Sequence, residues 1–196
     1  MKKALIASLF GIALNVTSSH GQGYIVMENY KVVGTTPVFS AVTYTPGGPY
    51  VSAASGFKAD LLFSLNGGIT FNLAAGSQTA FFAGSHDTGT PTTDGAGTFI
   101  GPNVTIPGYT SGSVQFIVEV YNGTSYAAGN TTLRGLSGLF TINSLQTSTL
   151  IVPGDILAIS GTTPTGLQPF ALVPEPTVFA LAGMGAAALM IVRRKK

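Results

Sequence analysis

The chain has 196 residues, of which 8% are charged and 45% are hydrophobic, and it has no cysteine. An average soluble domain carries about 25% charged residues. So few cations cannot form the basic surface that nucleic-acid binding needs, which excludes that class of protein. The lack of cysteine excludes disulfides, cysteine-ligated zinc and thiol catalysis. The length predicts one domain with short appendages.

The positive charge is concentrated at the two ends of the chain. Lys2 and Lys3 lie at one end. Between positions 22 and 173 there are three basic and six acidic residues, so the body of the chain is mildly acidic. The basic residues at the other end are Arg193, Arg194, Lys195 and Lys196.

Residues 1–21 are predicted to be a secretory signal peptide. The two N-terminal lysines precede an apolar stretch of 11 residues at positions 4–14. The small residues Ser19 and Gly21 then stand where a signal peptidase recognises its site, before position 22. Eleven residues are too few to span a bilayer. We therefore expect export through the Sec machinery, with the mature chain starting near residue 22.

Residues 177–192 form a second apolar segment, 16 residues without a charge, followed by the four basic residues. As a helix this segment would be about 24 Å long, slightly less than the ~30 Å hydrocarbon core. The flanking Arg and Lys side chains can extend to the membrane surface and make up the difference. The sequence thus predicts a single C-terminal transmembrane helix in the inner membrane, with the basic residues in the cytoplasm.

Pro174, Glu175 and Pro176 stand directly before this segment. The order of Pro-Glu-Pro, apolar helix and basic end over residues 174–196 resembles the PEP-CTERM sorting signal of Gram-negative bacteria. The resemblance implies an exosortase as partner, a membrane enzyme that removes the tail and passes the protein to the cell surface or the exopolysaccharide matrix. It implies nothing about the activity of the body. The two prolines favour an extended spacer that keeps the Glu175 carboxylate outside the membrane.

Strand signals dominate the body of the chain. Residues 57–65 and 113–121 alternate apolar and polar side chains, which is typical of half-buried strands. Asn66-Gly67 and Asn122-Gly123 follow these two segments and favour hairpin turns, the second leading into residues 124–128. The side chains predicted to face the core are Phe57, Ala59, Leu61, Phe63, Leu65, Val114, Phe116, Val118 and Val120.

Turn-rich segments separate several further predicted strands. Many short strands with frequent turns predict an all-β fold, an antiparallel β-sandwich of the jelly-roll-like kind, over residues 22–161. Residues 162–173 read as a linker between this domain and the sorting signal. The further strands are expected at residues 24–33, 38–44, 78–83, 103–106, 138–142 and 155–159.

Catalytic groups are scarce in the body, and we expect no catalytic residue. His86 lies between Ser85 and Asp87, but neighbours in an extended chain point to opposite faces, and no Gly-x-Ser-x-Gly elbow is present. A glycan-active enzyme would need two carboxylates to converge. Asp60 and Glu119 fall on the polar sides of predicted strands, where exposed carboxylates are ordinary.

A calcium site is the one cofactor that the sequence leaves open. Residues 86–97 bring Asp87, Asp94 and many backbone carbonyls into one Gly-rich segment. Calcium takes six to eight oxygen ligands, which such a segment can supply. The spacing departs from that of an EF-hand loop, and a solvated turn is the simpler interpretation.

Carbohydrate binding suits a β-sandwich at the cell surface. Tyr44, Tyr50 and Tyr109 lie beside Gly- and Pro-containing turns and could form an aromatic platform for a sugar. Two functions therefore follow from the sequence. The first is a non-enzymatic exported protein of the cell surface or exopolysaccharide matrix. The alternative is an extracellular polysaccharide-binding module, assisted by calcium or not.

Overall fold

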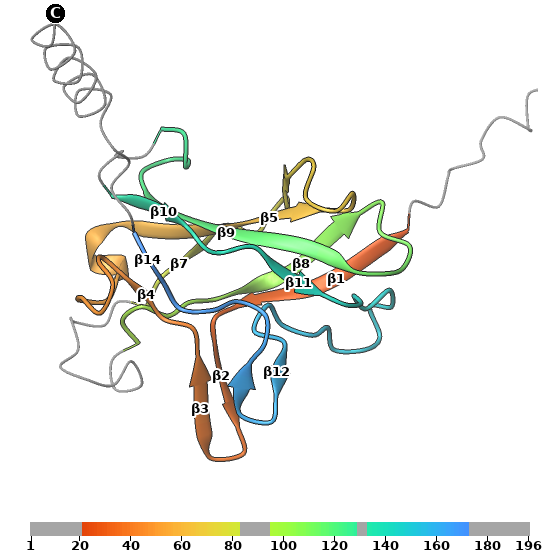
Figure 1. Ribbon diagram of the computed structural model, residues 1–196, viewed down its shortest axis with the longest axis horizontal. Helices are drawn as coiled ribbons and strands as arrows, with labels where there is room; N and C mark the ends of the chain where they lie inside the picture. The colour runs from red at the N-terminus through yellow and green to blue at the C-terminus, as the bar shows by residue number, and fades with distance from the viewer. Residues whose placement is uncertain (1–20, 83–94, 129–132, 173–196) are drawn as a thin grey trace, which may run out of the picture.

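The computed structural model describes residues 21–82, 95–128 and 133–172 (Figure 1). This part is all-β apart from one 3-10 turn, η1 (Ala53–Ser55). The strands are β1 (Gln22–Glu28), β2 (Tyr30–Val33), β3 (Thr36–Phe39), β4 (Val42–Thr43), β5 (Phe57–Ser64), β6 (Asn72–Leu73), β7 (Thr79–Ala80), β8 (Ile100–Pro107), β9 (Val114–Asn122), β10 (Arg134–Leu136), β11 (Phe140–Ile142), β12 (Ile159–Ser160), β13 (Thr163–Pro164) and β14 (Phe170–Ala171).

A central antiparallel sheet is built around β5 and β9. These strands pair along their whole shared length, from Phe57 opposite Asn122 to Ser64 opposite Gln115. The other edge of β9 pairs with β10 and then β11, and the other edge of β5 pairs with β6 and β7. The predicted antiparallel pairing of β5 with the segment after Asn66-Gly67 is confirmed, through a loop longer than a two-residue turn.

β1 and β8 form a second antiparallel layer that faces the central sheet (Figure 1). Side chains from both layers join one core, including Ile25 and Ile106 from the second layer and Leu61 and Val118 from the central sheet. Fully burying a side chain of this kind contributes about 1.5–3 kcal/mol. The described part therefore has a sandwich-like, all-β character, as the sequence predicted.

The predicted core faces are confirmed at every position but one. The alternating residues of β5 and β9 are buried, whereas Leu65 is 42% exposed because β5 ends one residue earlier. Asp60, predicted on the polar side of this strand, is also buried, and so is Ser64. Ser64 Oγ accepts a hydrogen bond from the Gly68 amide at 2.9 Å, so the loop after β5 folds back over this side of the strand.

The predicted strand at residues 24–33 is broken at Asn29. This residue is fully buried, and its amide nitrogen donates to the carbonyls of Ser40 (2.8 Å) and Gly97 (2.9 Å). Its side-chain oxygen accepts from the Phe99 amide at 2.6 Å. These bonds let the chain leave β1 and form the projecting β2–β3 hairpin, which turns at Gly34 with a positive φ of 63°.

The folded body continues past residue 161, so the predicted domain boundary and the predicted linker at 162–173 need correction. Leu167 and Leu172 are 0% and 2% exposed and belong to the core. β14 pairs with β4, the one parallel pair among the described strands, and the Leu172 amide donates to the Thr43 carbonyl at 2.8 Å. The two buried leucines thus hold this segment to the core, although its Thr, Gly and Pro content is typical of a linker.

Two further expectations differ from the structure. Residues 124–128 form turns, and the strand that pairs with the end of β9 is β10, with Arg134 opposite Tyr121. Asp155 forms an isolated bridge with Val26 and residues 156–157 turn, so only Ile159 of the predicted strand at 155–159 belongs to a strand. Among the described residues, no helix has the length and apolar character needed to cross a membrane. The predicted signal peptide and sorting signal lie outside the described residues, apart from Gly21.

Candidate functional site

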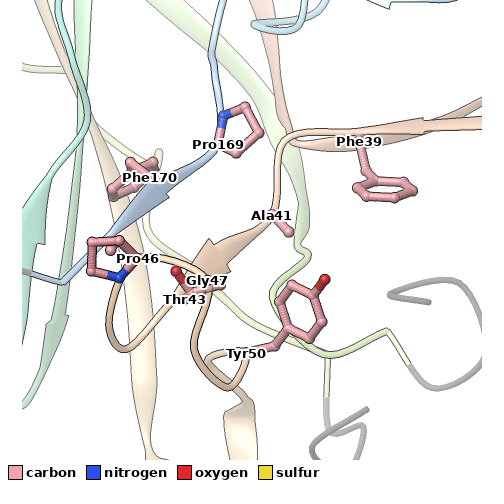
Figure 2. Close-up of a pocket in the computed structure, with 9 residues that line it drawn as sticks. Phe39, Ala41, Thr43, Pro46, Gly47, Tyr50, Pro169 and Phe170 are labelled. Carbon is pink, nitrogen blue, oxygen red and sulfur yellow. The ribbon is translucent and has the colours of Figure 1, made fainter. Parts of the chain in front are cut away.

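A pocket of about 460 Å³ opens where β14 lies beside β3 and β4 (Figure 2). No charged side chain lines it. We call it the Tyr50 pocket, and its lining residues are Phe39, Ala41, Thr43, Pro46, Gly47, Tyr50, Pro169, Phe170 and Ala171.

Parallel pairing and one tight turn build this pocket. The pairing of β14 with β4 brings Phe170 beside Val42, although the two are far apart in the sequence. The turn after β4 is closed by the Gly48 amide, which donates to the Thr45 carbonyl at 2.8 Å, and it returns Tyr50 to a position opposite Thr43. The pocket therefore depends on the C-terminal segment that the sequence presented as a linker.

Gly97 sets the position of the Tyr50 ring. Its φ is +77°, and a Cβ atom there would lie 2.8 Å from Tyr50 Cδ1 and 3.0 Å from the Val42 carbonyl oxygen. Any other residue would be strained by the backbone angle and would also push against the ring. The glycine lets the segment that precedes β8 pass close to Tyr50 and β4.

The chemistry of the Tyr50 pocket is apolar and aromatic. Phe39, Tyr50 and Phe170 are each partly exposed, and Figure 2 shows the Phe39 and Tyr50 rings on the same side of β4 with Phe170 on the other. The side-chain polar groups of the lining are the hydroxyls of Thr43 and Tyr50. Such a surface suits an apolar or amphipathic partner. A charged partner would lose its hydration there, which is energetically unfavourable.

The three tyrosines predicted to bind a glycan do not share one exposed face. Tyr50 lines the pocket. Tyr44 packs edge-on against Phe57 with ring centroids 5.5 Å apart, and its hydroxyl donates to Ser55. Tyr109 is 2% exposed, since its ring fills the core.

The hydroxyl of Tyr109 is also satisfied inside the protein. It donates to the Gly112 carbonyl at 2.9 Å and accepts from the Leu145 amide at 3.0 Å. A tyrosine buried in this way connects two loops and cannot contact a sugar. The predicted platform of three tyrosines is therefore not formed, and of the three only Tyr50 lines the pocket.

The predicted calcium ligands Asp87 and Asp94 lie outside the described residues, as do Ser85 and His86. Within the part of the chain that the structure describes, no group of three or more metal-ligating side chains gathers.

Asp60 and Glu119 form a carboxylate pair directly opposite each other on β5 and β9. Asp60 is 5% exposed and accepts a hydrogen bond from the Tyr121 hydroxyl at 2.5 Å, and that hydroxyl accepts from Gln78 Nε2 at 2.6 Å. Burial, and then the Asp60 charge, raise the pKa of Glu119. Burial and the bond to Asp60 also raise the pKa of Tyr121, so the phenol keeps the proton that it donates.

Glu28, Lys31 and Asp155 form a second charged cluster. Lys31 Nζ lies 2.6 Å from Asp155 Oδ2 and 3.7 Å from Glu28 Oε1. Burial, and then the Asp155 charge, raise the pKa of Glu28, while the bond to Asp155 raises the pKa of Lys31. Asp155 also accepts from the Ala158 amide at 3.0 Å, so the cluster ties the β2–β3 hairpin to the turn before β12.

These two carboxylate pairs are the described groups that could serve the glycan-active enzyme considered from the sequence. Paired acids at a cleft can cleave glycosidic bonds. Glu28 and Asp155 share the Lys31 ammonium group, and Asp60 accepts a hydrogen bond from the Tyr121 phenol, so three of the four carboxylates have an internal partner. Neither pair lines the Tyr50 pocket, whereas Lys31 and Asp155 line a separate pocket of about 380 Å³.

No family model, curated protein or solved structure matches the chain. The candidate site rests on geometry alone. Sequence reasoning missed Phe39 and Phe170, of which the second lies in the supposed linker. The apolar residues of the segment LQPFAL at 167–172 were the signal that could have revealed it.

Proposed function

We propose that this chain is a non-enzymatic, exported protein of the cell surface or exopolysaccharide matrix, sorted through a PEP-CTERM-type tail. The observation that carries the proposal is the order of residues 174–196, Pro-Glu-Pro, an uncharged segment and four basic residues. An N-terminal segment with the features of a signal peptide supports it. In this proposal the Sec machinery exports the chain, the tail holds it in the inner membrane, and an exosortase processes it.

The described body supports this proposal in two ways. An exported chain without cysteine must be stable without disulfides, and a two-layered β fold with a single hydrophobic core can provide that stability. The fold also reaches Leu172, leaving only Val173 before Pro174. We propose the finer description of the body as an antiparallel, jelly-roll-like sandwich on the strength of its two facing layers.

Expression in a Gram-negative host that carries an exosortase tests the sorting proposal. The wild-type chain should be shortened and recovered from the cell surface or medium. Glu175→Gln combined with Pro174→Ala should leave the full-length chain in the inner membrane. Pro102→Ala, at an exposed proline of β8 that does not line the Tyr50 pocket, is the matched control and should be processed normally. Full-length protein in the cytoplasm, or equal processing of all three chains, would overturn the proposal.

Polysaccharide binding is the alternative proposal, and Tyr50 is the one predicted tyrosine that supports it. Calorimetric titration with neutral and acidic polysaccharides, with and without calcium, tests it. Tyr50→Ala should abolish the heat of binding, whereas Tyr24→Ala, at a partly exposed position of β1 away from the pocket, should leave it unchanged. No heat with any polysaccharide would remove this alternative.

A further inference from the structure

The last buried residue of the body lies very close to the predicted membrane segment. Leu172 is held by its amide bond to the Thr43 carbonyl and by its place in the core. Four residues separate it from Thr177, the first residue of the apolar segment. Whatever their conformation, they span at most about 18 Å between the two Cα atoms.

This short tether leaves little room between the body and a membrane. The tether must cross one headgroup layer, which is about 5–8 Å thick. About 10 Å remains, which is only a few layers of water. In the anchored protein, the surface around Leu172 must therefore lie against or almost against the headgroups.

The surface at this exit point is the rim of the Tyr50 pocket. Phe170 and Ala171 immediately precede Leu172, and with Phe39, Pro46 and Tyr50 they present partly exposed, uncharged side chains. Tyrosine and other rings with one polar edge partition to the lipid–water interface. On the other side of Leu172, Gly135 packs against its backbone, and the next residue of β10, Leu136, is 48% exposed.

We propose that the rim of the Tyr50 pocket docks on the lipid–water interface of the membrane that holds the tail. This inference rests on the proposed function, because it needs the tail to be in the membrane. Docking orients the body so that the Pro-Glu-Pro motif lies at the membrane surface, where a membrane-embedded enzyme can reach it. Removal of the tail releases the rim, which is too small an apolar face to hold the body alone.

The absence of tryptophan from the chain makes the test direct. Tyr50→Trp and Phe170→Trp each place a single fluorescent reporter on the rim. Ile69→Trp is the matched control, since Ile69 is 81% exposed and follows β5 at the end of that strand remote from β14 (Figure 1). The full-length variants are reconstituted in phosphatidylethanolamine–phosphatidylglycerol vesicles, with and without lipids brominated high on the acyl chains.

Brominated lipid should quench the Tyr50→Trp and Phe170→Trp variants about twofold or more, because the rim would enter the headgroup–acyl boundary. The Ile69→Trp variant should be quenched hardly at all. Thermal unfolding of each variant shows that it is folded, and two reporters keep the test valid if one substitution disturbs the pocket.

Flotation of the vesicles separates the two proposals. If the protein does not float with the vesicles, the anchoring proposal fails. If it floats but the two rim reporters are quenched no more than the control, docking is overturned and anchoring stands. If a soluble polysaccharide and not the lipid changes the emission of the Tyr50→Trp variant, the occupant of the rim is a glycan, which also overturns docking.

Discussion

Leu172→Ala removes the side chain that holds the C-terminal segment to the core. Leu172 is 2% exposed and packs with core residues from the central sheet. Leu→Ala substitutions at such sites cost about 2–5 kcal/mol. The segment can partly collapse onto the gap because β14 is only two residues long. We therefore expect a loss of about 2–3 kcal/mol in the free energy of unfolding, the lower part of that range.

Thermal unfolding followed by circular dichroism measures this loss. For a body of this size the midpoint should fall by about 5–10 °C. Leu150→Ala is the control, because Leu150 is 95% exposed and its truncation should change stability by less than about 0.5 kcal/mol. Equal midpoints for the two variants would show that residues 162–172 are a linker after all and would refute the extension of the body to Leu172.

Three further substitutions test other parts of the fold. Glu119→Gln should stabilise the protein at neutral pH, since burial and Asp60 raise the pKa of Glu119 above its usual 4.5. A raised carboxyl pKa gives stability that is present at low pH and lost as the pH rises through it, so the gain should vanish below the ordinary carboxyl pKa. Asn29→Ala should cost about 3 kcal/mol or more, because it leaves buried backbone groups without partners. Gly97→Ala should destabilise the protein and displace Tyr50, which would change the emission of a tryptophan placed at position 50.

Each of these predictions has its own control. Urea midpoints for wild type and Glu119→Gln that keep the same difference at acid and neutral pH would contradict the raised pKa of Glu119. Asn103→Ala, at an exposed position, should be nearly neutral, and an equal loss for Asn29→Ala would contradict its bonding role. Gly112→Ala has the same kind of backbone strain, with φ +88°, but open space around it. It should destabilise the fold without changing the emission of a tryptophan at position 50.

The central sheet could be predicted because the alternation of apolar and polar residues is visible within each single strand. The apolar residues of β5 and β9 recur at every second position, and each strand is long enough to show the pattern. Their pairing follows from the same register, which puts Phe63 opposite Phe116. The burial of Asp60 could not be read from this pattern, since it depends on Tyr121 of β9 and on Gln78, which directly precedes β7.

The Tyr50 pocket could not be predicted, because long-range pairing creates it. β14 and β4 each have two residues and are far apart in the sequence. Neither strand is long enough to show an alternation of apolar and polar residues. The burial of Tyr109 could not be predicted for a related reason. It stands next to a glycine turn, yet its ring is drawn into the core and its hydroxyl bonds a loop more than thirty residues away, at Leu145.

The most direct measurement is the intact mass of the protein recovered from the envelope and medium of a host that carries an exosortase. The proposal of a sorted, surface-delivered body predicts a chain that has lost residues 1–21 and the basic end of the tail but still includes Leu172. A mass equal to the full 196 residues, recovered from the cytoplasm, would contradict it. A chain cut before Leu172 would contradict the extent of the folded body as well.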